Sequence, residues 1–203
     1  MIFNNKFILA SSSLSRFKIL KNNKLCFSKI NPLCNEANFK KKMILKKTPH
    51  KKISLELARI KSKSVSKKTK DMLVLGADTI ISFQGGVLSK ARNLKEAKKT
   101  ILNLSGKKHN IYSSAAFFLN GKEVWSVTQK STVKIRMLKE EDVDNYLKKT
   151  GKKILSCVGC YQAESLGPSI IEGIDGDFFN VLGLPLFPLL LFLRENNKGI
   201  YKK

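Results

Sequence analysis

The longest regular pattern in the chain is a pair of strand-like segments, residues 109–119 and 122–137, on either side of Asn120 and Gly121. Asn and Gly both tolerate positive φ, so this arrangement indicates a tight turn and an antiparallel β-hairpin. Shorter strand-like segments precede the hairpin at residues 7–10 and 72–75, and residues 80–83 continue in an extended conformation. Their alternation with helical segments predicts a mixed α/β fold whose long antiparallel strands separate two lobes.

Helical spacing of apolar residues marks the remaining regular segments. They are residues 14–20, 53–65, 140–147 and 185–193, and a segment that Asn93 caps and Ser105 ends. The polar, Lys-rich residues 35–52 are expected to form a surface loop. Because no internal repeat or low-complexity linker interrupts the pattern, we expect a single domain over residues 1–203.

The net charge of +24 comes from 39 Lys and Arg against 15 Asp and Glu. Such a charge suits either nucleic acid or a small ligand rich in phosphate. Nearly all of the basic residues are Lys, whereas specific base readers usually use the Arg fork. The Lys clusters around residues 40 and 67 also have almost no aromatic neighbours for base stacking. We therefore interpret most of the Lys excess as a solvated surface and do not expect nucleic-acid binding.

The cysteines and the apolar segments indicate the compartment. No secretory signal is recognisable before Cys26, so we expect a reducing, cytoplasmic environment and free thiols. Cys157 and Cys160 have the spacing of a zinc knuckle, but no second such pair accompanies them, and we expect no zinc site. The longest apolar run, residues 182–193, is broken by prolines and too short for a bilayer, which predicts no membrane span.

Two positions suggest a site for an anion or for acid–base chemistry. The strand at residues 7–10 runs into the serines of residues 11–13 and then into a helix, which is the arrangement of a helix N-terminus that binds an anion. An ordinary Ser cap is the alternative. Asp78 ends an apolar strand, a position that faces the ligand crevice in open α/β sheets, although an Asx-turn residue would also fit there.

Familiar hydrolase motifs are absent from the sequence. There is neither a Gly-x-x-x-x-Gly-Lys-Ser/Thr phosphate loop nor a Gly-x-Ser-x-Gly nucleophile elbow. Hydrolysis of a phosphoanhydride needs a positioned water, a base and positive charge near the phosphoryl oxygens. The serine-rich loop, Lys61, Asp78 and Lys90 are the candidates for these tasks.

A set of short segments, taken in order, resembles the motifs of the Maf family. The segments are residues 9–13 with Arg16, and residues 57–61, 76–79, 88–90, 104–109, 158–161 and 180–185. Each is weak alone, but together they cover essentially the whole chain in the family's order. The resemblance implies a mixed, elongated sheet with helices and two lobes around a central cleft, of the Maf/ITPase-like kind. It also implies hydrolysis of nucleoside triphosphates to monophosphate and pyrophosphate.

The resemblance assigns roles to individual residues. Asp78 matches the family's proton acceptor, and Glu36 matches an acidic position that would hold a divalent metal, Mg²⁺ or Mn²⁺, together with Asp78. The positions that match the triphosphate-binding residues are Ser11, Arg16, Lys61 and Lys90. A homodimer is expected from the same resemblance.

Three further positions are associated in this family with the choice of base, namely Ser15, Thr79 and Glu164. The branch that resembles dTTP and UTP hydrolases would have Arg, Thr and Gln there, and the branch that resembles 7-methyl-GTP hydrolases would have Trp, Gln and Glu. The chain agrees with each branch once, so the base stays open and activity on several nucleotides is expected. Two other functions remain as alternatives: a non-catalytic regulator of cell-division arrest, and a basic nucleic-acid-binding module.

Overall fold

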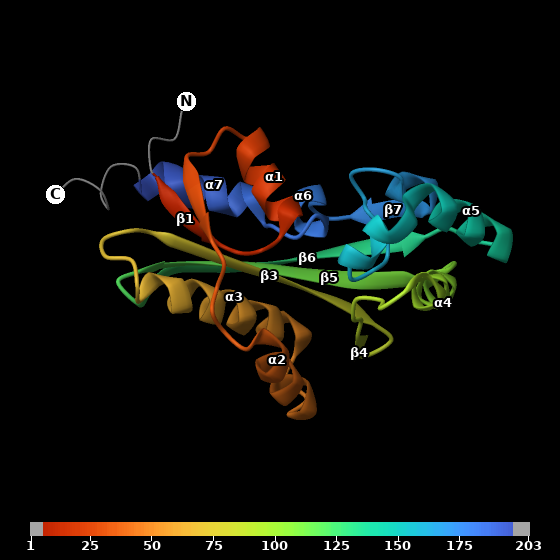
Figure 1. Ribbon diagram of the computed structural model, residues 1–203, viewed down its shortest axis with the longest axis horizontal. Coiled ribbons are helices and arrows are strands. Elements are labelled where there is room, and N and C mark those ends of the chain that lie inside the picture. Colours follow the sequence, from red (N-terminus) through yellow and green to blue (C-terminus); the bar gives the residue numbers. More distant parts are fainter. Residues whose placement is uncertain (1–5, 197–203) are drawn as a thin grey trace. The chain divides into compact units, whose positions relative to one another are not determined.

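A mixed seven-stranded sheet forms the framework of the protein. The computed structural model describes residues 6–196 (Figure 1). The strands are β1 Phe7–Ala10, β2 Phe27–Ile30, β3 Val74–Phe83, β4 Gly86–Val87, β5 Lys108–Leu119, β6 Lys122–Ile135 and β7 Ile171–Asp175. Their order is β2-β1-β3-β5-β6-β7, with β4 paired to β3. β1 runs parallel to β2 and β3, whereas β3 with β4 and β6 with β7 are antiparallel, which confirms the mixed α/β sheet.

Helices connect most of the strands. The α-helices are α1 Leu14–Asn22, α2 Glu36–Leu45, α3 His50–Ser66, α4 Leu94–Leu104, α5 Glu140–Thr150, α6 Phe178–Val181 and α7 Leu186–Glu195, and the 3₁₀ helices are η1 Gly151–Ser156 and η2 Gly167–Ser169. The turn of the β5–β6 hairpin has φ values of 49° at Asn120 and 78° at Gly121, so the predicted tight turn is confirmed.

The chain divides into two compact units. The first comprises Met1–Thr79, Tyr112–Gln129 and Gly183–Lys203 in their described parts, and the second comprises Ile80–Ile111 and Lys130–Leu182. Three of the boundaries fall inside β3, β5 and β6, so each of these strands contributes residues to both units, and the fourth lies between α6 and α7. The expectation of two lobes is met, but the long strands do not separate them, because parts of β3, β5 and β6 belong to each unit. A single domain over residues 1–203 stays a prediction.

In the first unit, helices cover both faces of the sheet (Figure 1). Ala116 and Phe118 of β5 pack with Ala58 of α3. Phe117, between them in sequence, stacks instead on Phe192 of α7, with the ring centroids 5.2 Å apart. Successive side chains of a strand point to opposite faces, so α3 and α7 must lie on opposite sides of β5.

Gly76 lets α3 approach β3 closely. A Cβ atom at this position would lie 2.2 Å from the carbonyl oxygen of Ala58 and 2.7 Å from the backbone nitrogen of Ser62. No side chain fits in that space, because backbone atoms of α3 already occupy it. The close approach brings the turn of α3 that carries Lys61 next to Asp78. The prediction that a strand ends at Asp78 is wrong, because β3 continues past this residue to Phe83.

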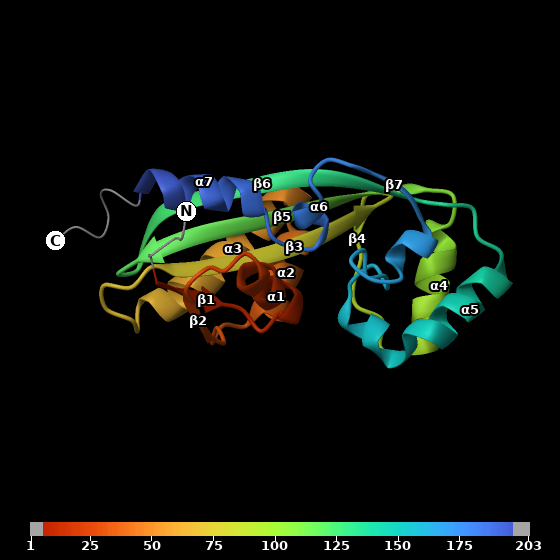
Figure 2. The ribbon, with the colours of Figure 1, turned by 90° about the horizontal axis from the view of Figure 1, so that it is seen from above.

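The second unit has a core of its own. α4 and α5 lie side by side and pack against the strand segments of this unit (Figure 2). Buried residues of this core include Ile101 and Leu104 of α4, Val143 and Leu147 of α5, and Ile111 of β5. The core also contains a polar pair, because Nε2 of His109 lies 2.6 Å from the hydroxyl of Tyr161. Burial lowers the pKa of His109 to about 4 and raises the pKa of Tyr161.

The His109 environment predicts an acid-sensitive step in stability. The ordinary pKa of 6.5 applies to the unfolded chain. Between pH 6.5 and about 4, His109 is therefore protonated in the unfolded chain but neutral in the folded protein. The free energy of unfolding is therefore unaffected by this group above pH 6.5 and falls by about 3 kcal/mol as the pH decreases to about 4.

Urea unfolding at a series of pH values measures this effect. We expect the free energy of unfolding of the His109→Gln variant to depend less on pH in that window than that of the unchanged protein. Equal pH dependence in both proteins would show that His109 is not the group responsible.

One predicted loop is a helix. Residues 35–52 were expected to form a surface loop, yet α2 occupies more than half of them and α3 begins at His50. The Asn35 side chain caps α2 by accepting a hydrogen bond from the backbone of Asn38 at 3.0 Å. No residue of α2 is fully buried. The helix therefore carries no apolar stripe, and this is why periodicity failed to reveal it.

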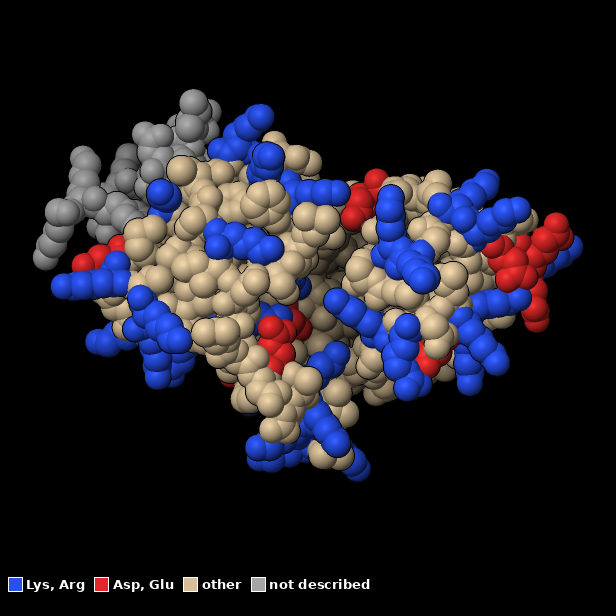
Figure 3. Space-filling model, in the orientation of Figure 1, with Lys and Arg blue, Asp and Glu red and all other residues tan. Residues whose placement is uncertain are grey.

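Basic side chains are spread over the visible face of both units instead of gathering in one patch (Figure 3). Among residues 6–196, no helix combines the length and the apolar character that crossing a bilayer requires. The four cysteines are free thiols. Within the same residues, His, Cys, Asp and Glu side chains form no group of three or more that could hold a metal ion.

Candidate active site

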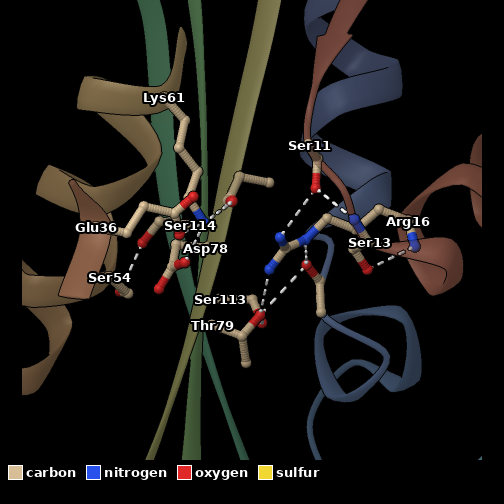
Figure 4. A network of polar contacts seen from close by, with 12 residues as sticks. Ser11, Ser13, Arg16, Glu36, Ser54, Lys61, Asp78, Thr79, Ser113 and Ser114 are labelled. Carbon is tan, nitrogen blue, oxygen red and sulfur yellow. Dashed lines mark hydrogen bonds and ion pairs between the residues drawn. The ribbon is translucent and has the colours of Figure 1, made fainter. Parts of the chain in front are cut away.

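An ammonium group between two carboxylates forms the centre of the candidate site in the first unit (Figure 4). Nζ of Lys61, on α3, lies 2.6 Å from Oδ1 of Asp78 on β3. The same nitrogen lies 2.7 Å from Oε2 of Glu36, the first residue of α2. Three elements that are separate in sequence therefore converge on one point. Sequence reasoning selected all three residues, and the structure brings them together.

The burial of these groups decreases from the ammonium outward. The exposed fraction of the side chain is 6% for Lys61, 13% for Asp78 and 41% for Glu36. A buried charge is tolerated when it is paired, and Lys61 is paired twice. Two carboxylates against one ammonium leave one negative charge in excess within this group of three residues.

The donor chemistry of Asp78 and Glu36 fits a hard divalent ion. Mg²⁺ is commonly bound through one or two carboxylates, with waters and substrate phosphates completing its shell. Lys61 already places positive charge between these two carboxylates, so the position is suited to a cation. Each ion pair uses only one oxygen of its carboxylate, Oδ1 in Asp78 and Oε2 in Glu36.

Arg16 is the second charged centre of the site. Its Nε donates a hydrogen bond to the carbonyl oxygen of Gly183 at 2.8 Å. Its Nη2 donates to Oγ1 of Thr79 at 3.1 Å, and its Nη1 donates to Oγ of Ser11 at 3.4 Å. The planar guanidinium thus joins the residue after β1, the strand β3 and the segment before α7. Ser13 orients the helix that carries Arg16, because its side chain accepts from the backbone nitrogen of that residue.

The carboxylates of the first centre act on Arg16. Burial lowers the pKa of the guanidinium, and the negative charges of Asp78 and Glu36 oppose that change. Arg16 is therefore within electrostatic reach of both acids. Its side chain is held rigidly by neutral partners, and its charge is balanced by the same acids that bind Lys61.

Thr79 has more contacts than the sequence indicated. Besides accepting from Arg16, its hydroxyl lies 2.9 Å from the Oγ of Ser113 and 3.3 Å from the carbonyl oxygen of Gly183. Gly183 has a φ of +100°, and a Cβ there would lie 3.0 Å from Oγ1 of Thr79. A side chain at position 183 would therefore disturb both the backbone and the contact with Thr79.

Sequence reasoning missed the serines of β5. Ser113 contacts Thr79, and Ser114 lies 2.7 Å from Oγ of Ser54 on α3. Both serines of β5 are fully buried. The available signal was a pair of hydroxyl residues, Ser113 and Ser114, directly before the apolar second half of β5, because buried hydroxyls need partners.

The remaining predicted residues lie elsewhere. Ser15 is half-buried in the first turn of α1. Lys90 and Glu164 are exposed and belong to the second unit. Both act on Cys157: burial raises the pKa of this thiol, Glu164 adds to the rise, and Lys90 opposes it. The structure therefore brings Lys90 and Glu164 into one neighbourhood, while their roles toward a substrate stay predictions.

Comparisons with known proteins identify the family to which the chain is similar. The family model described as Maf-like protein matches residues 6–196. A 7-methyl-GTP pyrophosphatase of Bartonella quintana is 39% identical over 192 residues, which cover 93% of this chain and 94% of the relative. A nucleoside triphosphate pyrophosphatase of Caulobacter vibrioides is 34% identical over 186 residues, covering 92% and 93%. Among solved structures, a HAM1 protein from Coxiella burnetii matches with a TM-score of 0.42 and 17% identity, over 64% of this chain and 73% of that one.

Proposed function

The chain belongs to the family of Maf-like proteins, and we propose that it hydrolyses nucleoside triphosphates to the monophosphate and pyrophosphate. The observation that carries this proposal is the convergence of Asp78, Glu36 and Lys61, with Arg16 within electrostatic reach. Acid groups that accept a proton or a metal, next to cations that bind phosphate, are what cleavage of a phosphoanhydride requires. The names of the two bacterial pyrophosphatases support the same activity.

In the proposed reaction, Asp78 acts as the general base. Its carboxylate orients a water molecule and takes its proton as the oxygen bonds to the α-phosphorus of the nucleotide. The anhydride bond breaks, and pyrophosphate leaves with the bonding electrons. Asp78 suits this role because it is nearly buried while Lys61 holds it through a single oxygen.

Positive groups would stabilise the charge of the triphosphate. Lys61 and Arg16 are the buried cations of the first unit, and Ser11 adds a hydroxyl beside Arg16. We assign these residues to phosphate binding, together with Lys90. Asp78 and Glu36 would hold Mg²⁺ or Mn²⁺, which when bound supplies further positive charge at the phosphoryl oxygens.

The choice of base should depend mainly on Glu164. The hydroxyl of Thr79 is engaged by Arg16, Ser113 and Gly183, so its hydrogen-bonding capacity is used within the protein. Ser15 is too small to supply the wall or donor that Arg or Trp would provide. With both positions weak, we expect hydrolysis of several nucleotides and no preference above about a thousandfold for any one of them, since each unpaired buried group costs roughly 1–3 kcal/mol.

Pyrophosphate release from dTTP, UTP, GTP and 7-methyl-GTP tests the function and its selectivity together. The proposed function fails if the purified protein releases pyrophosphate from none of them in the presence of Mg²⁺ or Mn²⁺. We expect Glu164→Gln to shift the ratio of kcat/KM values toward dTTP and UTP, because an amide both donates and accepts. A ratio that the substitution leaves unmoved would remove Glu164 from base selection.

A further inference from the structure

Lys61 occupies the position between Asp78 and Glu36 that a cation would otherwise take. Its Nζ contacts one oxygen of each carboxylate, at 2.6 and 2.7 Å. Its side chain is buried, and Gly76 allows the helix that carries it to lie directly against β3. The two acids proposed as metal ligands are therefore also the two partners of an internal ammonium group.

A divalent ion and this ammonium group cannot use the same carboxylates independently. Both are cations, and their mutual repulsion is strong at contact distance where water is largely excluded. Arg16 adds a further positive charge within electrostatic reach of both acids. When an ion binds to Asp78 and Glu36, the ammonium must loosen its contacts with them. The flexible four-carbon stem of Lys permits such a movement.

We propose that Lys61 is an internal competitor of the divalent ion. In the absence of metal it holds the two carboxylates together, and on metal binding it is released toward the phosphates of the substrate. This role rests on the proposed function, because it assumes that Asp78 and Glu36 are the metal ligands. It explains why a residue assigned to phosphate is bound to two acids in this structure.

Binding of Mn²⁺ in the absence of any nucleotide tests the competition. Free Mn²⁺ is measured by electron paramagnetic resonance during a titration of the purified protein. We expect Lys61→Met to bind Mn²⁺ at least about tenfold more tightly than the unchanged protein, because the competing charge is gone. Lys63→Met is the matched control. It removes the same charge from an exposed position two residues along α3 and should leave the Mn²⁺ affinity unchanged within about twofold.

A second titration tests where the ammonium goes. Inorganic tripolyphosphate, added without metal, is expected to bind at least about tenfold more weakly to Lys61→Met than to Lys63→Met. Opposite changes for Mn²⁺ and tripolyphosphate are the signature of a group that serves one ligand and competes with the other. A residue with a purely supporting role would weaken both.

The outcomes separate clearly. Mn²⁺ affinity of Lys61→Met that equals or falls below that of the Lys63→Met control overturns the proposal, as does the absence of Mn²⁺ binding to all three proteins at millimolar concentration. Circular dichroism establishes that the variants are folded, and Lys61→Gln serves if the Met variant is not. These titrations involve no turnover. A protein that releases no pyrophosphate but shows the opposite changes would lose the proposed activity and keep the competition.

Discussion

Replacing Asp78 by Asn should lower kcat/KM for nucleoside triphosphates by at least about a hundredfold while leaving the protein folded. General base catalysis is typically worth a factor of this size or more. The Asn side chain keeps an oxygen that can accept the hydrogen bond of Lys61, now made at 2.6 Å to Oδ1 of the acid. It cannot take a proton, and it presents no full charge to a metal. The variant should therefore lose catalysis but keep the hydrogen bond between Lys61 and position 78 that joins α3 to β3.

The measurement is pyrophosphate release at saturating metal, with thermal unfolding of the same samples. Asp71→Asn is a matched control. Asp71 is exposed, and its side chain accepts a hydrogen bond from the side chain of Asn120 in the hairpin turn. We expect that control to retain activity. Turnover of the Asp78→Asn variant close to that of the control would remove Asp78 from the role of base.

Much of the framework could be predicted because it depends on local patterns. Asn120 and Gly121 indicated the hairpin, and Asn93 indicated the start of α4, where its side chain accepts from the backbone of Glu96. The α2 helix could not be predicted in this way. It has no buried residue, so no periodicity marks it, and its cap, Asn35, is a residue equally common in loops.

The residues of the candidate site also differ in whether a local sequence pattern marks them. Asp78 was recognisable as an acid that follows an apolar run, although β3 continues past it to Phe83. The family motif marked Lys61 as a phosphate-binding residue, and its ion pair with Asp78 was not predicted. The polar contacts of Arg16 were not recognisable, because its acceptors Thr79 and Gly183 are 63 and 167 residues away in sequence. Hydrogen bonds between distant segments leave no periodic signal. They depend on how the sheet orders β1 and β3, which only the folded structure reveals.

Replacing Arg16 by Met should lower the free energy of unfolding by about 3 kcal/mol or more. Met fills much of the same volume but removes the three hydrogen bonds that the charged guanidinium donates to the Gly183 carbonyl and to the hydroxyls of Thr79 and Ser11. Hydrogen bonds that involve a charged group contribute roughly 1.5–3 kcal/mol each. The carboxylates of Asp78 and Glu36 also lose a balancing charge. A shift of the unfolding midpoint by roughly 10 °C is expected for a chain of this size.

Urea unfolding measures the loss, and two comparisons make it specific to the guanidinium fork. Arg16→Lys keeps the charge but has a single nitrogen for acceptors on three segments, so it should recover only part of the stability. Arg92→Met removes an exposed arginine just before α4 that pairs with Glu96, four residues further along the chain. This substitution should leave the urea concentration at the unfolding midpoint unchanged. The decisive pattern is a large loss at position 16, partial recovery with Lys and no loss at position 92. If Arg16→Met and Arg92→Met unfold at the same urea concentration, the hydrogen bonds from Arg16 to Gly183, Thr79 and Ser11 do not stabilise the fold. A loss of activity in the Arg16→Met variant would then report on phosphate binding alone.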